Sequence, residues 1–301
     1  MSRTPLMLFV SMCAIVASGQ TAGDFGTRYG DPDVERFVIR PGVTLTVAYG
    51  SDRTGCQMIV EPKRSILKSD NESELMPREI VPEVLEEILP ESSGDTLLGN
   101  IEQVVSCDLQ VHSTHYDVTI NDASRERACH ASERGEANML IVREDRPCGT
   151  ADSWGDVSIA QTAIDLHNRY GVPDAQRYVV RPGITLMVSY GSDQSACEMV
   201  IERKRSIIPL GEGENYVRPE VMTDIIDEVL PEADRGKLLL GVVTKSGCND
   251  LETMDYENVT IHRFRHRCRL PNPEIEGTAT ITRKNTSCGA INSGLPGIQK
   301  P

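Results

Sequence analysis

One stretch of 40 residues occurs twice in this chain. Residues 28–67 are RYGDPDVERFVIRPGVTLTVAYGSDRTGCQMIVEPKRSIL, and residues 169–208 are RYGVPDAQRYVVRPGITLMVSYGSDQSACEMVIERKRSII. An ungapped alignment of the two gives 24 identical positions out of 40. A long internal repeat indicates a tandem duplication, so we expect both halves of the 301-residue chain to adopt the same fold.

The N-terminus has the pattern of a secretory signal peptide. Arg3 precedes an apolar run from Leu6 to Ala17, and small residues follow it. This run is shorter than the roughly 20 apolar residues that a membrane-spanning helix needs. We therefore predict a signal peptide over residues 1–22. The mature protein is expected to be secreted, or periplasmic or extracellular, with no membrane insertion after the signal is removed.

The cysteine pattern agrees with export. Cys13 lies in the predicted signal peptide, and the other eight cysteines fall four to each half, at offsets of 141, 141, 139 and 140 residues. An even number per half in an exported chain predicts two disulfides within each half. No pair has the C-x-x-C spacing of a structural zinc site, so we predict no metal site.

The repeated stretch has the pattern of paired β-strands. Residues 37–39 precede Pro41-Gly42, a pair typical of a type II turn, and apolar side chains then alternate over residues 43–49. Residues 50–52 break this strand, and a second alternating run begins at Cys56. The short connection predicts a β-hairpin.

An amphipathic helix and two further strands are predicted after this hairpin in each half. The helix of the second half has apolar residues at helical spacing from Val221 to Val229, and Pro231 ends it. The later strands are expected at 116–120 and 138–143, and at 259–264 and 278–283. The order ββαββ predicts an α+β fold with one helix packed on an antiparallel sheet.

These elements divide the chain into two tandem homologous modules. We predict a first repeat module over residues 23–148, a linker over 149–168, a second module over 169–288 and a frayed tail over 289–301. Two modules of the same shape are expected to pack against each other as a pseudo-dimer.

Four cysteines in each half allow three pairings, and strand geometry favours one of them. A cysteine before the third strand and one after the fourth lie at the end of a hairpin where two strands meet. The favoured pairs are Cys107–Cys148 with Cys56–Cys129, and Cys248–Cys288 with Cys197–Cys268.

Sequence motifs of catalysis are missing from the chain. It has no G-x-S-x-G or H-E-x-x-H pattern, and we interpret the six histidines as surface residues. The repeated carboxylates Asp52 and Asp193 are better explained as turn caps, and Glu61 and Glu202 as strand-end ion pairs, than as a catalytic pair. We predict no catalytic residue and no cofactor.

A set of basic and acidic positions shared by both halves provides candidate ligand-binding residues. They could form a basic cleft that recognises a carboxylate or sulfate, or they could form salt bridges with Asp33, Asp174, Glu61 and Glu202. We favour salt bridges, because positions shared by both copies most simply serve the fold that both adopt. The candidates are Arg36, Arg40, Asp52, Lys63 and Arg64, with their equivalents Arg177, Arg181, Asp193, Lys204 and Arg205.

The formal net charge of −14 makes nucleic acid and anionic membrane surfaces poor partners. The sequence therefore favours an exported binding protein, such as an inhibitor or a surface factor, whose partner is a protein or a small ligand. One alternative is a small secreted hydrolase with a site between the modules, in which Asp52 or Asp193 acts with a lone histidine. Another is a structural envelope protein.

Overall fold

The computed structural model describes residues 20–66, 162–204, 217–266 and 275–284, the single positions 83, 84, 87, 286 and 288, and the backbone of four strands between residues 97 and 143. These parts form a mixed α+β structure with one antiparallel sheet and a few short helices, which confirms the predicted fold class. The predicted signal peptide up to residue 19, most of the predicted linker and the tail from 289 lie outside the described residues.

Each half of the chain contributes seven strands to the sheet. The N-terminal half contains β1 (Val34–Arg40), β2 (Val43–Tyr49), β3 (Gly55–Pro62), β4 (Leu97–Val105), β5 (Asp108–His115), β6 (Val118–Glu126) and β7 (Arg134–Arg143). The C-terminal half contains β8 (Ala175–Arg181), β9 (Ile184–Tyr190), β10 (Ala196–Arg203), β11 (Leu238–Ser246), β12 (Asn249–Tyr256), β13 (Val259–His266) and β14 (Ile275–Arg283). The helices that the structure describes in full are α1 (Ala22–Tyr29), α4 (Ala163–Tyr170), α5 (Pro219–Val229) and α6 (Glu232–Arg235).

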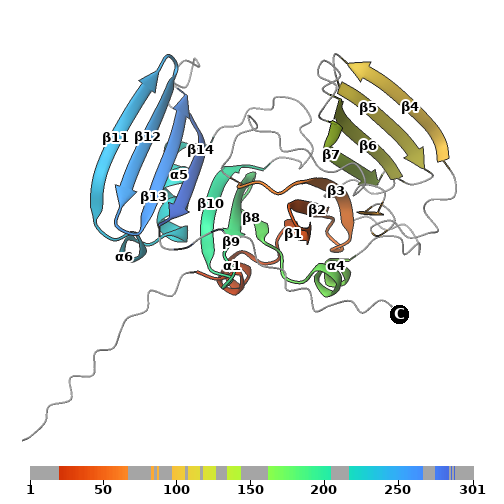
Figure 1. Ribbon diagram of the computed structural model, residues 1–301. Coiled ribbons are helices and arrows are strands. Elements are labelled where there is room, and N and C mark those ends of the chain that lie inside the picture. Colours follow the sequence, from red (N-terminus) through yellow and green to blue (C-terminus); the bar gives the residue numbers. More distant parts are fainter. Residues whose placement is uncertain are drawn as a thin grey trace, which may run out of the picture.

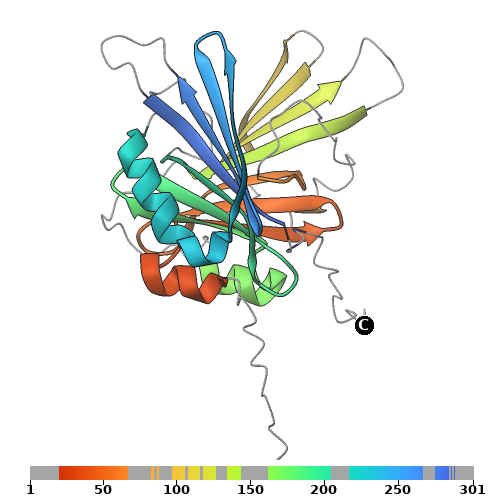
Figure 2. The ribbon, with the colours of Figure 1, turned by 90° about the vertical axis from the view of Figure 1, so that its left-hand side faces the viewer.

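The strand order runs in the same way outward from the middle of the sheet. It is β11-β12-β13-β14-β10-β9-β8-β1-β2-β3-β7-β6-β5-β4, with β8 and β1 at the centre and β11 and β4 at the two edges. Figure 1 shows the outer strands of each half rising from the central strands as two wings. In Figure 2, α1 and α4 lie beneath the central strands, on the side away from the wings.

The predicted turn between β1 and β2 is present in both halves. Gly42 and Gly183 have φ values of 77° and 73°, the left-handed conformation that the second central residue of a type II turn requires. The strands on either side pair antiparallel and bury their apolar face, where Phe37 and Leu45 are fully buried. The predicted hairpin at Cys56 is present as the antiparallel pair of β2 and β3.

The first helix of each half packs on the other half of the chain. Helix α1 precedes β1, yet its Phe25 is buried in the core of the C-terminal half, where its ring lies 5.9 Å from that of Tyr178. Helix α4 precedes β8, yet its Leu166 is buried among the apolar residues of the N-terminal half, beside Phe37. The two helices are therefore exchanged between the halves.

The two exchanged helices are also equivalent in sequence and begin with the same cap. Thr21 accepts a hydrogen bond from the amide of Asp24, whose carboxylate binds back to Thr21, and Thr162 and Asp165 form the same capping box. Such a cap satisfies backbone donors that the first helical turn leaves free. The internal repeat therefore begins at Thr21, seven residues before Arg28, because 28 − 21 = 7. Helix α4 extends across the predicted boundary at residue 169.

The predicted order ββαββ has too few strands. The C-terminal half has three strands before α5 and four after α6. The strands missed after the helix are β4 and β5 in one half, and β11 and β12 in the other. Strand β11 escaped detection because it lies at the sheet edge and is exposed on both faces, so its sequence lacks the alternation of a half-buried strand.

Helix α5 forms where the sequence predicts it, and it completes the larger core. Met222, Ile225, Ile226 and Val229 are buried against strands of the C-terminal half. In the N-terminal half, residues 83, 84 and 87 are helical and Val84 is buried, in agreement with the helix predicted there.

One disulfide joins Cys197 to Cys288, with 5.5 Å between their Cα atoms. The predicted pairs Cys248–Cys288 and Cys197–Cys268 are therefore wrong. The reason is the unpredicted hairpin, since Cys248 lies in the turn between β11 and β12 at the sheet edge, whereas β14 pairs with β10 and leads to Cys288. Cys56 and Cys248 each take part in a disulfide as well, with other cysteines as their partners. The predicted pairs Cys107–Cys148 and Cys56–Cys129 involve cysteines outside the described residues.

Candidate functional site

The two halves meet where the short antiparallel pair of β1 and β8 closes the centre of the sheet. Glu35 faces Gln176 in this pair, with Val34 opposite Arg177 and Arg36 opposite Ala175. Glu35 and Gln176 hold equivalent positions of the repeat, because 176 − 35 = 141. The junction is thus centred on one pair of equivalent residues.

Two predicted ligand-binding residues of the N-terminal half bind a carboxylate of the C-terminal half. The guanidinium of Arg36 donates to both oxygens of Asp174, at 2.9 and 3.2 Å, and the Lys63 ammonium lies 3.3 Å from the same carboxylate. The side chains of Arg36 and Asp174 are only 8% and 5% exposed, so water screens this pair weakly.

The reverse arrangement is present on the other side of the junction. Arg177 and Lys204 lie 2.9 and 3.0 Å from the Asp33 carboxylate. Burial raises the pKa of Asp33, but the hydrogen bonds and charges of Arg177 and Lys204 outweigh burial and hold that pKa below its ordinary value. The two sets of ion pairs therefore fasten the halves to each other.

Arg40 and Arg181 bind carboxylates within their own halves. Arg40 lies 2.6 Å from Glu87, and Arg181 forms the equivalent ion pair with Glu228 on α5. Slight burial raises the pKa of Glu228, but the hydrogen bonds and charge of its neighbours, Arg181 foremost, hold it below its ordinary value. These arginines connect the hairpin turn to the helix above it.

Asp52 and Asp193 stabilise the hairpin turns between β2 and β3 and between β9 and β10. Asp52 accepts hydrogen bonds from the amide and hydroxyl of Thr54, and Asp193 does the same with Ser195. The Ser195 hydroxyl is the main reason that the pKa of Asp193 lies below its ordinary value. Both carboxylates have the geometry of turn-capping aspartates.

The last two predicted residues are Arg64 and Arg205. The backbone carbonyl of Arg64 accepts a hydrogen bond from Arg36, and Arg205 lies outside the described residues. The side chains of Arg36, Arg40, Asp52 and Lys63, and those of their four equivalents in the C-terminal half, all bind partners inside the chain. Their role in ligand binding stays a prediction.

A buried polar network at the junction was not predicted. The carboxylate of Glu35, 1% exposed, accepts hydrogen bonds from Tyr49 and Gln176 at 2.8 Å each and lies 3.0 Å from the ring of His167 on α4. Burial is the main reason that the pKa of Tyr49 is raised. One sequence signal was a difference in charge within the repeat, because Glu35 of the first copy stands opposite Gln176 of the second. The hydrolase hypothesis assigned Asp52 or Asp193 to a lone histidine, whereas His167 contacts Glu35.

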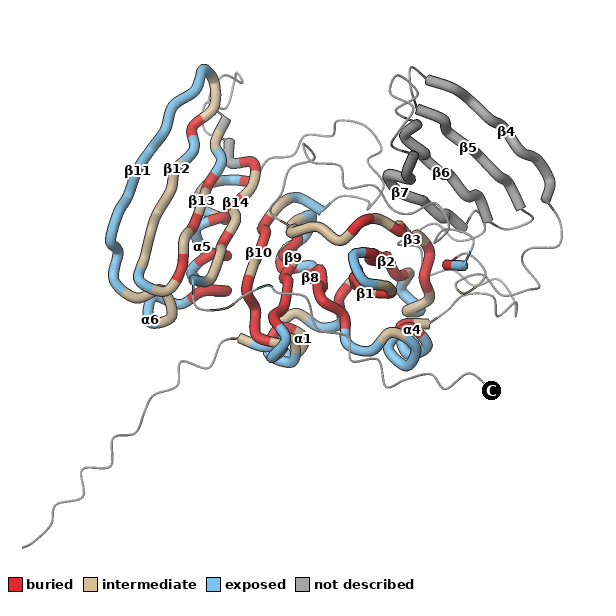
Figure 3. The backbone as a smooth tube through the Cα atoms, in the orientation of Figure 1, coloured by how far each residue is buried: buried red, intermediate tan, exposed pale blue. Residues whose placement is uncertain are grey.

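Strand β11 presents the largest run of exposed apolar side chains in the described structure. Figure 3 shows this edge strand exposed along its length. Its large side chains are between 44% and 57% exposed, whereas core residues such as Ile261 on β13 are fully buried. Leu251 on the neighbouring strand β12 and Phe264 on β13, the strand after it, are each 40% exposed. The exposed residues of β11 are Leu238, Leu239, Leu240, Val242 and Val243.

Where the structure describes the chain, no three His, Cys, Asp or Glu side chains are grouped closely enough to hold a metal ion. None of the described helices is both long and apolar enough to cross a bilayer.

The chain matches no protein-family model, and no curated protein is significantly similar to it in sequence.

Proposed function

We propose that this chain is an exported binding protein that takes up an extended segment of a partner polypeptide along strand β11. The observation that carries the proposal is the exposure of all five large apolar side chains of this edge strand. Soluble proteins rarely expose contiguous apolar surface unless it is used for binding.

The backbone of β11 supports the same proposal. Its pairing with β12 uses one side of the strand, and none of the described strands lies beyond it. An edge strand presents amide and carbonyl groups that an added strand can bind, and side chains on both faces then enter the contact. Proteins that avoid such contacts place charges or prolines on the edge, whereas β11 carries one charge, Lys245, near its end.

Charge favours a partner that differs from the chain itself. A second copy would bring two molecules of formal net charge −14 together, and like charges repel. A neutral or basic segment meets no such repulsion. The proposed partner is therefore an extended apolar segment with basic flanking residues.

We also propose that the chain is exported after cleavage near residue 19. Gln20 and Thr21 take part in the fold, because the Gln20 carbonyl accepts the Ala196 amide at 2.8 Å and Thr21 caps α1. Cleavage after Ala22 would remove this cap, whereas cleavage after Gly19 would keep it. Disulfide formation supports export, since such bonds persist in oxidising compartments.

We propose that the two halves are homologous modules with one disulfide pattern. Non-reducing peptide mapping of the mature protein should then recover Cys56–Cys148, which is the equivalent of Cys197–Cys288. The remaining cysteines should pair as Cys107–Cys129 and Cys248–Cys268. A Cys56–Cys129 peptide would contradict the equivalence of the modules.

The strand-addition proposal is tested with a labelled nine-residue peptide of alternating valine and threonine flanked by lysines. Fluorescence anisotropy should show saturable binding to the full mature chain. Val242→Lys should weaken this binding at least tenfold, because it places a charge on the apolar edge. Since Val242 is already 44% exposed, this change should leave the unfolding midpoint nearly unaltered.

Two controls make the peptide experiment specific. Lys237→Gln changes one charge just before β11 and should leave binding unaltered, and a peptide with a central proline should not bind because it cannot complete the strand. Absence of saturable binding, or equal binding by the Val242→Lys variant, would contradict the proposal.

A second candidate function is structural assembly from identical copies. The 14 strands of the sheet alternate in direction, so the two edge strands β11 and β4 are antiparallel to each other. The β4 edge of one copy could thus add antiparallel to the β11 edge of the next, which agrees with a structural envelope protein. Analytical ultracentrifugation decides between the two, because concentration-dependent growth that Val242→Lys abolishes would favour assembly over a separate partner.

A further inference from the structure

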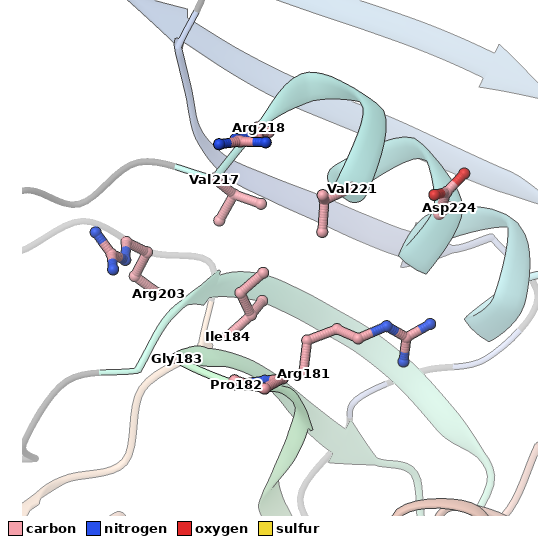
Figure 4. A pocket seen from close by; sticks show the side chains of 9 residues that line it. All are labelled: Arg181, Pro182, Gly183, Ile184, Arg203, Val217, Arg218, Val221 and Asp224. Carbon is pink, nitrogen blue, oxygen red and sulfur yellow. The ribbon is translucent and has the colours of Figure 1, made fainter.

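We propose that the C-terminal half binds a small organic monocarboxylate with an apolar body in a pocket beside α5. The pocket has a volume of about 540 Å³ and lies between the first turns of α5, the β8–β9 turn and the end of β10 (Figure 4). None of its lining residues belongs to β11, so this proposal is independent of strand addition.

The middle of the pocket is apolar. Val217 and Val221 extend toward it from the start of α5, and Ile184 faces them from the start of β9 (Figure 4). Val217 is buried, and the other two side chains are partly exposed toward the pocket side. Such a lining suits the hydrocarbon part of a ligand, and the volume lies within the range of small-molecule pockets.

Positive charge gathers at one end of this apolar middle. Arg203 and Arg218 lie at the same side of the pocket in Figure 4, and both are exposed. The Arg218 guanidinium forms no hydrogen bond or ion pair with the described residues, and its side chain does not cap α5. The positive end of the helix dipole adds to the field at this position.

The opposite end of the pocket has a different charge. Asp224 and Arg181 lie there, and Arg181 is neutralised by Glu228. A ligand with anions at both ends would bring one of them near Asp224, which disfavours it. A single carboxylate at the Arg203 and Arg218 end, with an apolar body over the valines, matches the distribution of charge.

The N-terminal half provides an internal comparison. The turn residues of the pocket are shared, since Arg181, Pro182 and Gly183 correspond to residues 40–42. The two arginines at the basic end are not shared, because Arg203 and Arg218 correspond to Pro62 and Pro77 at the same offset of 141. A strand such as β3 therefore forms with proline at the position of Arg203. Arg203 is therefore not required for this strand to form, which favours a role in binding for it.

The choice of a carboxylate follows from the chemistry of arginine. Guanidinium groups bind carboxylate oxygens through paired, charge-assisted hydrogen bonds, and each such bond is stronger than one between neutral groups. The apolar middle then distinguishes an organic carboxylate from an inorganic anion.

The test uses hexanoate as the probe and the full mature chain. Methyl NMR shifts of Ile184, Val217 and Val221 should change in a saturable way as hexanoate is added. Hexanol, which lacks the charge, and sodium sulfate, which lacks the apolar body, should each bind at least tenfold more weakly. Arg203→Gln and Arg218→Gln should each raise the dissociation constant about tenfold.

Lys237→Gln serves as the matched control, because it removes one positive charge outside the pocket and should leave the hexanoate affinity unchanged. Unaltered methyl spectra of the ligand-free variants show that both arginine substitutions preserve the fold. Three outcomes overturn the proposal. Hexanol or sulfate could bind as tightly as hexanoate, or a variant that combines Arg203→Gln with Arg218→Gln could retain the wild-type affinity for hexanoate.

Discussion

Phe25→Ala should lower the free energy of unfolding by about 3–5 kcal/mol, and the weakened region should be the half of the chain that does not contain Phe25. The ring is 2% exposed and packs 5.9 Å from Tyr178 and 6.5 Å from Tyr190, both in the C-terminal half. Removing it leaves a cavity in that core, and Phe25 is the one residue of the short helix α1 that is buried there.

Hydrogen exchange measured by mass spectrometry locates the effect. In the Phe25→Ala variant the amides of β8 and β9 should exchange faster, whereas those of β1 and β2 should change little. Leu166→Ala is the matched control, because Leu166 is fully buried at the equivalent position and should produce the reverse pattern. If each substitution instead weakened the half that contains it, the helix exchange would be wrong.

The helix exchange has a consequence for how the two halves behave. Each half completes its core with a helix from the other, so neither core is whole without both halves. A partner segment on β11 or an anion beside α5 would act on the same C-terminal core that α1 completes. The junction thus gives a physical route by which binding on one half can stabilise the other.

Local patterns in the sequence predicted the parts of the fold that depend on local chemistry. The Pro41-Gly42 turn, the strand over residues 43–49 and the helix ending at Val229 all follow from short-range rules of conformation and periodicity. The edge strand β11 was missed because its apolar residues occur in a continuous run exposed on both faces. Periodicity identifies a strand through one buried face, and β11 has none.

The features that involve distant residues could not be predicted in this way. Pairing Cys197 with Cys288 depends on β14 lying beside β10, across 91 residues of sequence. The helix exchange leaves no trace in local sequence, because Phe25 would be equally apolar if it packed on its own half. The predicted salt bridges to Asp33 and Asp174 are present, but they cross to the opposite half, which the sequence did not indicate.

Asp174→Ala should cost about 3–5 kcal/mol of unfolding free energy, because it leaves the buried Arg36 guanidinium without its counter-charge. Arg36 is 8% exposed, so water cannot replace the two hydrogen bonds that Asp174 accepts from it. Denaturant unfolding of the purified chain measures the loss. Asp33→Ala is the matched control and should cost less, since the Asp33 carboxylate is 19% exposed and water can reach part of the site.

Two further measurements separate an uncompensated charge from a simple loss of packing. Adding Arg36→Met to Asp174→Ala should restore part of the stability, because the double variant contains no unpaired buried charge. The cost of Asp33→Ala should also depend on pH. The folded-state pKa of Asp33 is lowered, so its contribution is complete above the unfolded value of about 3.9 and is lost as pH falls through the folded value. The stabilities of the Asp33→Ala variant and the wild type should therefore begin to converge as pH falls below about 4, and should meet only below the folded-state pKa of Asp33. Additive losses in the double variant, together with a difference that persists in acid, would show that these carboxylates do not hold the halves together by charge.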